Sequence, residues 1–271
     1  MDAASLDPAA ARALLEWQLE MGADCAVEAT PVDRFALPER MPPGAGEAAA
    51  APPAPAAARL AAAPEDPVAA AEAAAAAASD LPALRAALSR YPHCELRLGA
   101  RSLVFADGDP RARVMVVGEA PGRDEDREGR PFVGQAGRLL DRMLGAIGLD
   151  RAAEDPGRGV YVTNVLPWRP PQNRDPEPAE TAMMLPFLRR HVALADPEVL
   201  VLMGNHACAA VLGRKGITKL RGQWTTGLDR PALPMLHPAY LLRQPHAKRH
   251  AWADLLALAE RLGLPADPRA G

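Results

Sequence analysis

The sequence contains few cysteines, and their spacing excludes several classes of protein. Only Cys25, Cys94 and Cys208 occur, far apart and without a CxxC pair. Such spacing argues against a disulfide framework and against a self-evident metal site, and it fits a reducing compartment. The N-terminus lacks a basic stretch followed by an apolar core, and the alanine-rich runs are too short and too weakly apolar to span a bilayer. We therefore expect a cytoplasmic protein that does not engage a membrane.

A strong overall charge and the common nucleotide-binding motifs are also missing. The formal net charge is −3 at pH 7, which gives no global basic signal for nucleic acid but is compatible with a local basic groove. The chain has no Walker motif, no GxGxxG and no metal-ligand spacing. Function must therefore be sought in local patterns.

The 271 residues divide by composition into three segments. Residues 1–37 include a short amphipathic pattern at 8–22 that is typical of a helix. Residues 38–80 are mostly alanine, proline and glutamate, which bury too little apolar surface to offset the entropy of ordering. We expect a disordered linker there, with the alanine run at 68–79 as its most helical part. Residues 81–265 carry regular apolar patterns and should form the folded domain.

Short apolar strands alternate with helical patterns in this domain. Four buried strands are expected at 114–117, 160–165, 199–203 and 232–236. A further short strand is expected at 103–105, and a hairpin around 220–226. Helices are expected at 81–90, 139–147, 178–193, 206–212 and 246–262, with a charged loop at 123–130. This alternation predicts a three-layer α/β/α sandwich around a mainly parallel four-stranded sheet.

Polar side chains stand at the ends of three of the four strands. Glu119 follows the first strand, Asn164 lies at the end of the second, and His237 follows the fourth. Because the carboxyl ends of parallel strands share one edge, these side chains can converge on one small ligand. An amide suits the edge of a base, and Phe132 offers a flat face for stacking. Each residue alone has a structural explanation, as a turn cap, a loop carboxylate or a core aromatic, so their coincidence is what favours a site.

Three longer motifs carry a resemblance to a known family. The stretch GEAPGRDEDREGRPFVGQAGRLLDRML at 118–144 resembles the first signature of the family-4 uracil-DNA glycosylases. TNVLPWRPPQNR at 163–174 resembles the second signature, and HPAYLLR at 237–243 the last. The resemblance is colinear over 84–262. It implies a uracil-DNA glycosylase-like fold and an enzyme that hydrolyses the N-glycosidic bond of uracil in DNA, leaving an abasic site for base-excision repair.

The resemblance also implies roles for the residues that match by position. Phe132 would stack on the flipped uracil, and Asn164 would read its O4 and N3 edge. Glu119 and the backbone of Ala120 would lie beside the sugar and a base carbonyl. His237 would hydrogen-bond uracil O2, where negative charge collects as the base departs.

A second asparagine and the last motif supply the remaining expectations. Asn173 would lie near the attacking water or the substrate, and the expected catalytic set is Glu119, Asn173 and His237. The loop after the histidine would press into the duplex and hold phosphates. The candidates for DNA binding are Tyr240, Leu241, Leu242, Arg243, Lys248 and Arg249, with His246 and His250 alongside. Without the resemblance, these basic residues are more simply interpreted as a solvated helix face.

The cysteines depart from the family pattern. Its members usually carry four cysteines that bind a [4Fe–4S] cluster. Here only Cys94 matches a ligand position, and Tyr91, Trp168 and Met184 (or its neighbour Met183) occupy the others. One thiolate cannot hold such a cluster, so we expect no cofactor, with aromatic and thioether groups filling the space. The alternative of a cluster as in the family is disfavoured on this ground.

Two further readings remain open beside the enzyme. One is a non-cleaving protein of the same superfamily that binds uracil-DNA or abasic sites. The other is an interaction module in which residues 1–35 recruit a replication or repair protein, which is compatible with catalysis. No lysine stands at a motif position to form a Schiff base, and 168–174 lacks the histidine of a covalent-trapping branch. We expect a monofunctional glycosylase that acts as a monomer.

Overall fold

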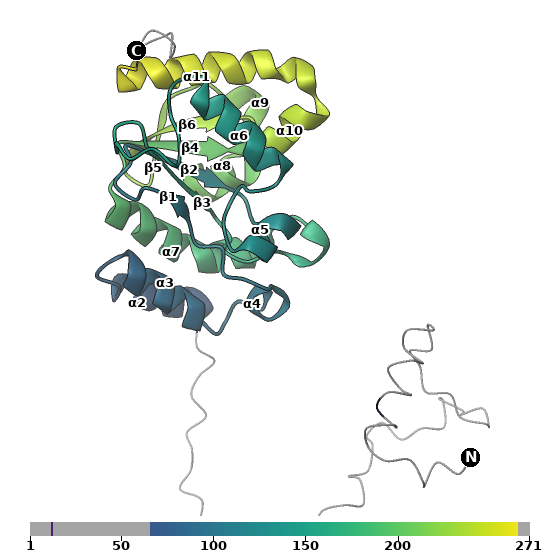
Figure 1. Cartoon of the computed structure of the whole chain (residues 1–271). Coiled ribbons are helices and arrows are strands. Elements are labelled where there is room, and N and C mark those ends of the chain that lie inside the picture. Colours follow the sequence, from purple (N-terminus) through teal and green to yellow (C-terminus); the bar gives the residue numbers. More distant parts are fainter. Residues whose placement is uncertain (1–11, 13–65, 265–271) are drawn as a thin grey trace, which may run out of the picture. The chain divides into compact units, whose positions relative to one another are not determined.

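The computed structural model describes residue 12 and residues 66–264. The chain divides into two units, 1–60 and 61–271, and the account below concerns the second (Figure 1). Apart from Arg12, the helix expected within 1–37 and the partner-binding segment lie outside the described residues, as does the part of the expected linker before residue 66. No helix in the described part of the chain is long and apolar enough to cross a membrane.

The centre of this unit is a six-stranded sheet in the order β1-β3-β2-β4-β6-β5. The strands are β1 (Asp107–Gly108), β2 (Val114–Gly118), β3 (Val160–Asn164), β4 (Val199–Met203), β5 (Thr225–Gly227) and β6 (Arg230–Met235). The central strands β3, β2, β4 and β6 are parallel, whereas both edge strands pair antiparallel. The four predicted parallel strands are thus confirmed. The predicted number of strands is wrong, because two short edge strands complete the sheet.

Helices flank both faces of this sheet (Figure 1). The helices are α2 (Pro67–Ala76), α3 (Leu81–Arg90), α4 (Leu96–Gly99), α5 (Arg123–Glu128), α6 (Gln135–Gly145), α7 (Pro178–Ala195), α8 (Gly204–Leu212), α9 (Ile217–Leu220), α10 (Pro238–Arg243) and α11 (Lys248–Leu262), with the 3-10 turns η2 (Pro171–Asn173) and η3 (Pro245–Ala247). Alternate residues of each strand point to opposite faces. In β2, Val114 and Val116 join the core beneath α6 and α11, and Met115 and Val117 join the core beneath α3 and α7.

Three local predictions are wrong. Residues 103–105 form no strand, and the edge strand lies at 107–108 instead. The hairpin joins β5 to β6, after the short helix α9, and does not lie at 220–226. Part of the charged segment expected as a loop forms α5, in which Glu125 accepts a hydrogen bond from the backbone N–H of Gly122 and so caps the first turn.

The linker prediction is also wrong for residues 66–80, because α2 and the N-cap residue of α3 are ordered there, although the alanine run at 68–79 is helical as expected. Asp66 caps α2 by accepting a hydrogen bond from Val68 N at 2.9 Å. Ala71 and Ala75 are buried, and Arg190 of α7 donates two hydrogen bonds to Ala78 O, at 2.9 and 2.7 Å. Alanine lets two helices approach closely, so this composition packs here without large apolar side chains.

Candidate active site at the carboxyl ends of the strands

The carboxyl ends of β2, β3 and β6 open onto one cavity of about 600 Å³. The predicted catalytic and uracil-binding residues all line it: Glu119, Ala120, Phe132, Asn164, Asn173 and His237. They come from segments more than 100 residues apart, which the parallel sheet brings to one edge. The cavity is therefore large enough for one base and bounded by polar groups on several sides.

Gly118, the last residue of β2, allows two of these side chains to lie against the strand end. A Cβ atom at this position would lie 2.3 Å from Asn164 Oδ1 and 2.6 Å from the Phe132 ring. Both side chains are buried. A bare backbone is required here, because any larger residue would displace the amide or the aromatic ring.

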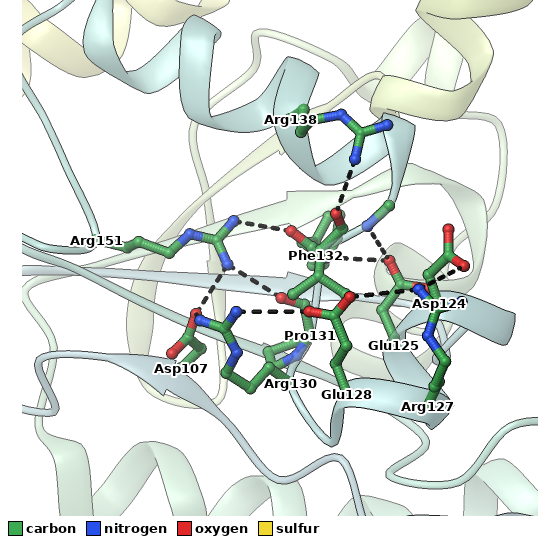
Figure 2. Close-up of polar contacts among 12 residues, drawn as sticks. Asp107, Asp124, Glu125, Arg127, Glu128, Arg130, Pro131, Phe132, Arg138 and Arg151 are labelled. Carbon is green, nitrogen blue, oxygen red and sulfur yellow. Dashed lines mark hydrogen bonds and ion pairs between the residues drawn. The ribbon is translucent and has the colours of Figure 1, made fainter.

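Phe132 has a backbone conformation that the surrounding residues must hold in place. Its φ of 54° lies in the left-handed region, which is strained for an aromatic residue. Arg151 donates hydrogen bonds to the carbonyl oxygens of Pro131 and Phe132, at 3.0 and 3.2 Å, and pairs with Asp107 at 3.1 Å (Figure 2). Gly137 lets α6 approach the same carbonyl, since a Cβ there would lie 1.8 Å from Phe132 O.

The carboxylate of Glu125 fixes the other side of this loop. Its Oε1 accepts hydrogen bonds from the backbone N–H groups of Val133 and Gly134, at 3.1 and 3.0 Å (Figure 2). Its Oε2 accepts from Gly122 N at 3.1 Å. One side chain thus joins the turn after β2 to the loop that carries the aromatic ring. The ring is positioned before any ligand enters.

His237 is held as a neutral hydrogen-bond donor. It caps α10, with Nδ1 accepting a hydrogen bond from Ala239 N at 3.1 Å. Burial lowers its pKa to about 4, and the charge of Arg243 acts in the same direction. A neutral imidazole whose Nδ1 accepts carries its proton on Nε2. The ring stacks on Phe132 with centroids 5.6 Å apart.

Glu119 belongs to a group of three titratable side chains, two of which sequence reasoning missed. His206 Nε2 lies 3.8 Å from Glu119 Oε2 and 3.6 Å from Asp175 Oδ2. Burial raises the pKa of the Glu119 carboxyl; His206 acts to lower that pKa and Asp175 to raise it. The signal for His206 was present, because it comes three residues after the strand β4, near the same edge of the sheet.

Asn173 lies at the rim of the cavity. It is exposed on η2 with a φ of 55°. Its Oδ1 accepts a hydrogen bond from Arg169 Nε at 2.7 Å. The amide oxygen is thus engaged by the loop itself, which leaves the amide nitrogen to face a ligand.

The expected DNA-binding residues divide into three groups. Tyr240 and Arg243 line the cavity, and Leu242 beside them is exposed at 39%. Leu241 is 0% exposed within the core, so the structure removes it from the residues able to fill a gap in DNA. Lys248 and Arg249, like His246 and His250, are exposed but do not line the cavity, and the two cations border a separate hollow beside Trp252.

The residues at the cluster positions do not fit an iron–sulfur cluster. Tyr91, Cys94, Trp168 and Met184 are all buried in one apolar cluster, and only one of them offers a thiolate. Burial raises the pKa of the Cys94 thiol, which opposes the deprotonation that metal binding requires. Four ligands are needed for such a cluster, and this donor set supplies one.

The fold and the cavity define a class that comparison with known proteins identifies. Residues 105–256, more than half of the chain, match the model of the Uracil DNA glycosylase superfamily. A type-4 uracil-DNA glycosylase of Sulfurisphaera tokodaii is 37% identical over 177 residues, covering 62% of this chain and 78% of the relative. Those of Thermotoga maritima and Archaeoglobus fulgidus are 41% and 37% identical, covering 55% and 63% of this chain and 77% and 87% of the relatives. The chain belongs to the type-4 uracil-DNA glycosylase family.

Proposed function

We propose that this protein is a monofunctional uracil-DNA glycosylase, which flips uracil out of DNA and removes it hydrolytically for base-excision repair. The observation that carries the proposal is the neutral His237, whose Nε2 proton is available in a cavity shared with Phe132 and Asn164. The family supports it, because the relatives named above are uracil-DNA glycosylases. The finer fold is a three-layer α/β/α sandwich.

The reaction follows from the charges that develop. A flipped uracil stacks on Phe132, and the amide of Asn164 reads its edge. When the bond from C1′ to N1 breaks, its electron pair goes to the base and negative charge collects on O2, where Nε2–H of His237 stabilises it. The Glu119 carboxylate stabilises the cation-like sugar and orients water. The water oxygen bonds to C1′ while its proton passes to solvent, and the uracil anion takes up a proton from solvent. Asn173 contacts the water from the rim.

DNA is bound next to this cavity. Tyr240, Leu242 and Arg243 on α10 meet the gap in the duplex, and Lys248 and Arg249 hold phosphates beyond it. The protein acts as a monomer, and residues 1–35 are a docking segment for a repair or replication protein. A gel-shift series over salt concentration tests the phosphate contacts. Each lost contact should reduce the slope of log binding constant against log salt concentration by about 1.

We further propose that catalysis proceeds without an iron–sulfur cluster. The support is the donor set, in which Tyr91, Trp168 and Met184 pack as apolar side chains beside the single thiol. Anaerobic purification followed by iron and labile-sulfide analysis tests this. Stoichiometric iron and sulfide would overturn it.

A strand-nicking assay tests the main proposal. Purified protein is incubated with a labelled duplex containing one U opposite G and then treated with hot alkali. His237→Ala and Asn164→Ala should each slow cleavage about 100- to 1,000-fold, because each removes a donor aimed at the departing base. Leu98→Ala, at a side chain that is 77% exposed, is the control and should cleave normally. Tight binding without cleavage by the wild type would instead assign the protein to the non-cleaving class.

A further inference from the structure

Three side chains from separate elements meet beside the carboxyl end of β2. Glu119 follows that strand, His206 lies in the first turn of α8, and Asp175 follows η2. One nitrogen of the imidazole approaches both carboxylates: Nε2 lies 3.8 Å from Glu119 Oε2 and 3.6 Å from Asp175 Oδ2. All three residues line the cavity. The arrangement joins the strand end, the helix and the proline-rich loop.

The backbone around His206 directs its side chain to this place. Gly204 begins α8 directly after β4 with a φ of 89°, a conformation that glycine adopts without strain. The next residue, Asn205, is turned toward α9, where its Oδ1 accepts hydrogen bonds from Gly216 N and Ile217 N at 3.0 and 2.8 Å. These contacts fix the first turn, so that the following side chain faces Glu119.

The other charged groups lining the cavity are occupied elsewhere. Glu125 accepts three backbone hydrogen bonds, and Arg174 pairs with Glu180 and Glu177. The charge of Arg243 is directed at His237, whose pKa it helps to lower, so that this imidazole is neutral. Among the described residues that line the cavity, His206 is therefore the group able to carry positive charge within 4 Å of a Glu119 oxygen.

We propose that His206 is a positioning residue: its imidazole keeps Glu119 ionised and aimed at the sugar, and Asp175 approaches the same Nε2 atom. The inference rests on the proposed glycosylase activity, because only there does Glu119 require its charge. A half-buried carboxylate tends to take up a proton. A cation beside it extends the acidic range in which the carboxylate stays charged.

The acid limb of the pH–rate profile reports this charge. Because the pKa of His237 is about 4 and that of Glu119 is raised by burial, Glu119 should be the group that limits activity as pH falls. His206→Gln removes the cation and should move the limb to higher pH. Asp175→Asn removes a negative charge that raises the pKa of Glu119 and should move the limb to lower pH.

The experiment is single-turnover uracil release at saturating enzyme, measured across pH for the wild type and both variants. A chelator is present, because the ligand atoms of the three residues lie within 4.8 Å of one another and would bind a stray divalent cation. At about pH 8 the rates should be equal. Below the acid limb they should differ about tenfold for each pH unit that separates the midpoints of the two profiles. Lys215→Gln, which removes a cation at an exposed site outside the cavity, should leave the limb in place.

A second measurement keeps this inference separate from the proposed activity. The side-chain carboxyl carbon of Glu119, assigned by its loss in Glu119→Gln, is titrated by 13C NMR without any substrate. Opposite displacements of its midpoint in His206→Gln and Asp175→Asn support the inference even if no uracil is released. Equal midpoints in all three proteins, or a loss of rate that is uniform over pH, would overturn it.

Discussion

Two regions of the sheet, its carboxyl edge and the face beneath α3 and α7, differ in how their side chains are held. At the carboxyl edge, Phe132 keeps a left-handed backbone and Gly118 has no room for a side chain. On the face beneath α3 and α7, Tyr91, Trp168 and Met184 are packed in an apolar cluster. The first region is fixed by ion pairs and backbone hydrogen bonds, and the second by apolar burial. The residues of the first match the family motifs, whereas those of the second depart from them.

In this chain the residues that depart from the family motifs pack in the supporting core, and those that match them line the cavity. Two histidines show how the surroundings decide the role of a side chain. His191 is bonded to Tyr161 Oη at 2.9 Å and stacked on Phe105 with centroids 4.4 Å apart, within the protein. His237 is less buried than His191 and faces the cavity. Burial lowers the pKa of both, to about 3 and about 4, so only the surroundings separate a structural from a functional imidazole.

The largest effect should come from the apolar region and should fall on stability. Trp168→Ala leaves a cavity in the buried cluster and should lower the free energy of unfolding by about 3–5 kcal/mol. Uracil release by the folded fraction should stay close to that of the wild type. Urea denaturation and single-turnover assays measure the two quantities, with Leu98→Ala as the exposed control. Loss of rate at unchanged stability would break the proposed separation of the two regions.

The converse effect should come from the carboxyl edge. Gly118→Ala forces the Asn164 amide or the Phe132 ring to move, because the new Cβ would lie within 2.6 Å of both. A displacement of this size should slow uracil release about 100-fold. Gly145→Ala, at a helical site with nothing within 4 Å of the new Cβ, is the matched control. Equal rates for these two variants would contradict the strain argument.

A smaller effect should come from His191 and should appear as a dependence of stability on pH. The pKa of His191 is lowered from 6.5 to about 3 by burial, so between these values the unfolded chain binds a proton that the folded protein does not. Stability should therefore fall with decreasing pH, with this residue contributing up to about 1.4 kcal/mol per pH unit. His191→Gln should flatten that dependence, as measured by urea denaturation at several pH values. An unchanged slope would show that the imidazole is not the group that titrates.

The smallest effect should come from one hydrogen bond at the edge of the apolar region. The Tyr91 hydroxyl donates to Pro67 O at 2.5 Å and so ties α3 to α2. Tyr91→Phe keeps the ring against Phe187 and should cost about 1 kcal/mol of unfolding free energy. Hydrogen exchange should rise mainly in α2. Uniform loss of protection would contradict this local role.

The sequence predicted the parts of the fold that repeat a simple apolar period. The four central strands and the helix at 81–90 are confirmed. The edge strands β1 and β5 have only two and three residues, which is too short for any alternation to be visible. The alanine run at 68–79 was expected to be the most helical part of the linker, and α2 forms there. Its packing was not foreseen, because alanine buries little surface by itself although it lets helices lie in close contact.

The site was predictable where a residue stood at a strand end inside a recognisable motif. Glu119, Asn164 and His237 satisfied both conditions. His206 comes three residues after β4 but outside any recognised motif, and Asp175 lies in a loop just after the second motif, so neither satisfied both conditions. Arg151 and Glu125 hold the Phe132 loop through backbone atoms, and contacts of that kind leave no pattern in a sequence.

The hydrogen bond from Ala239 N to His237 Nδ1 couples the imidazole to the start of α10. By accepting this hydrogen bond, His237 Nδ1 fixes the tautomer of the imidazole and also caps α10, the helix that carries Tyr240 and Arg243. The catalytic histidine and the proposed DNA-contacting residues are thus held by one hydrogen bond. A displacement of α10 would therefore move the His237 imidazole together with Tyr240 and Arg243.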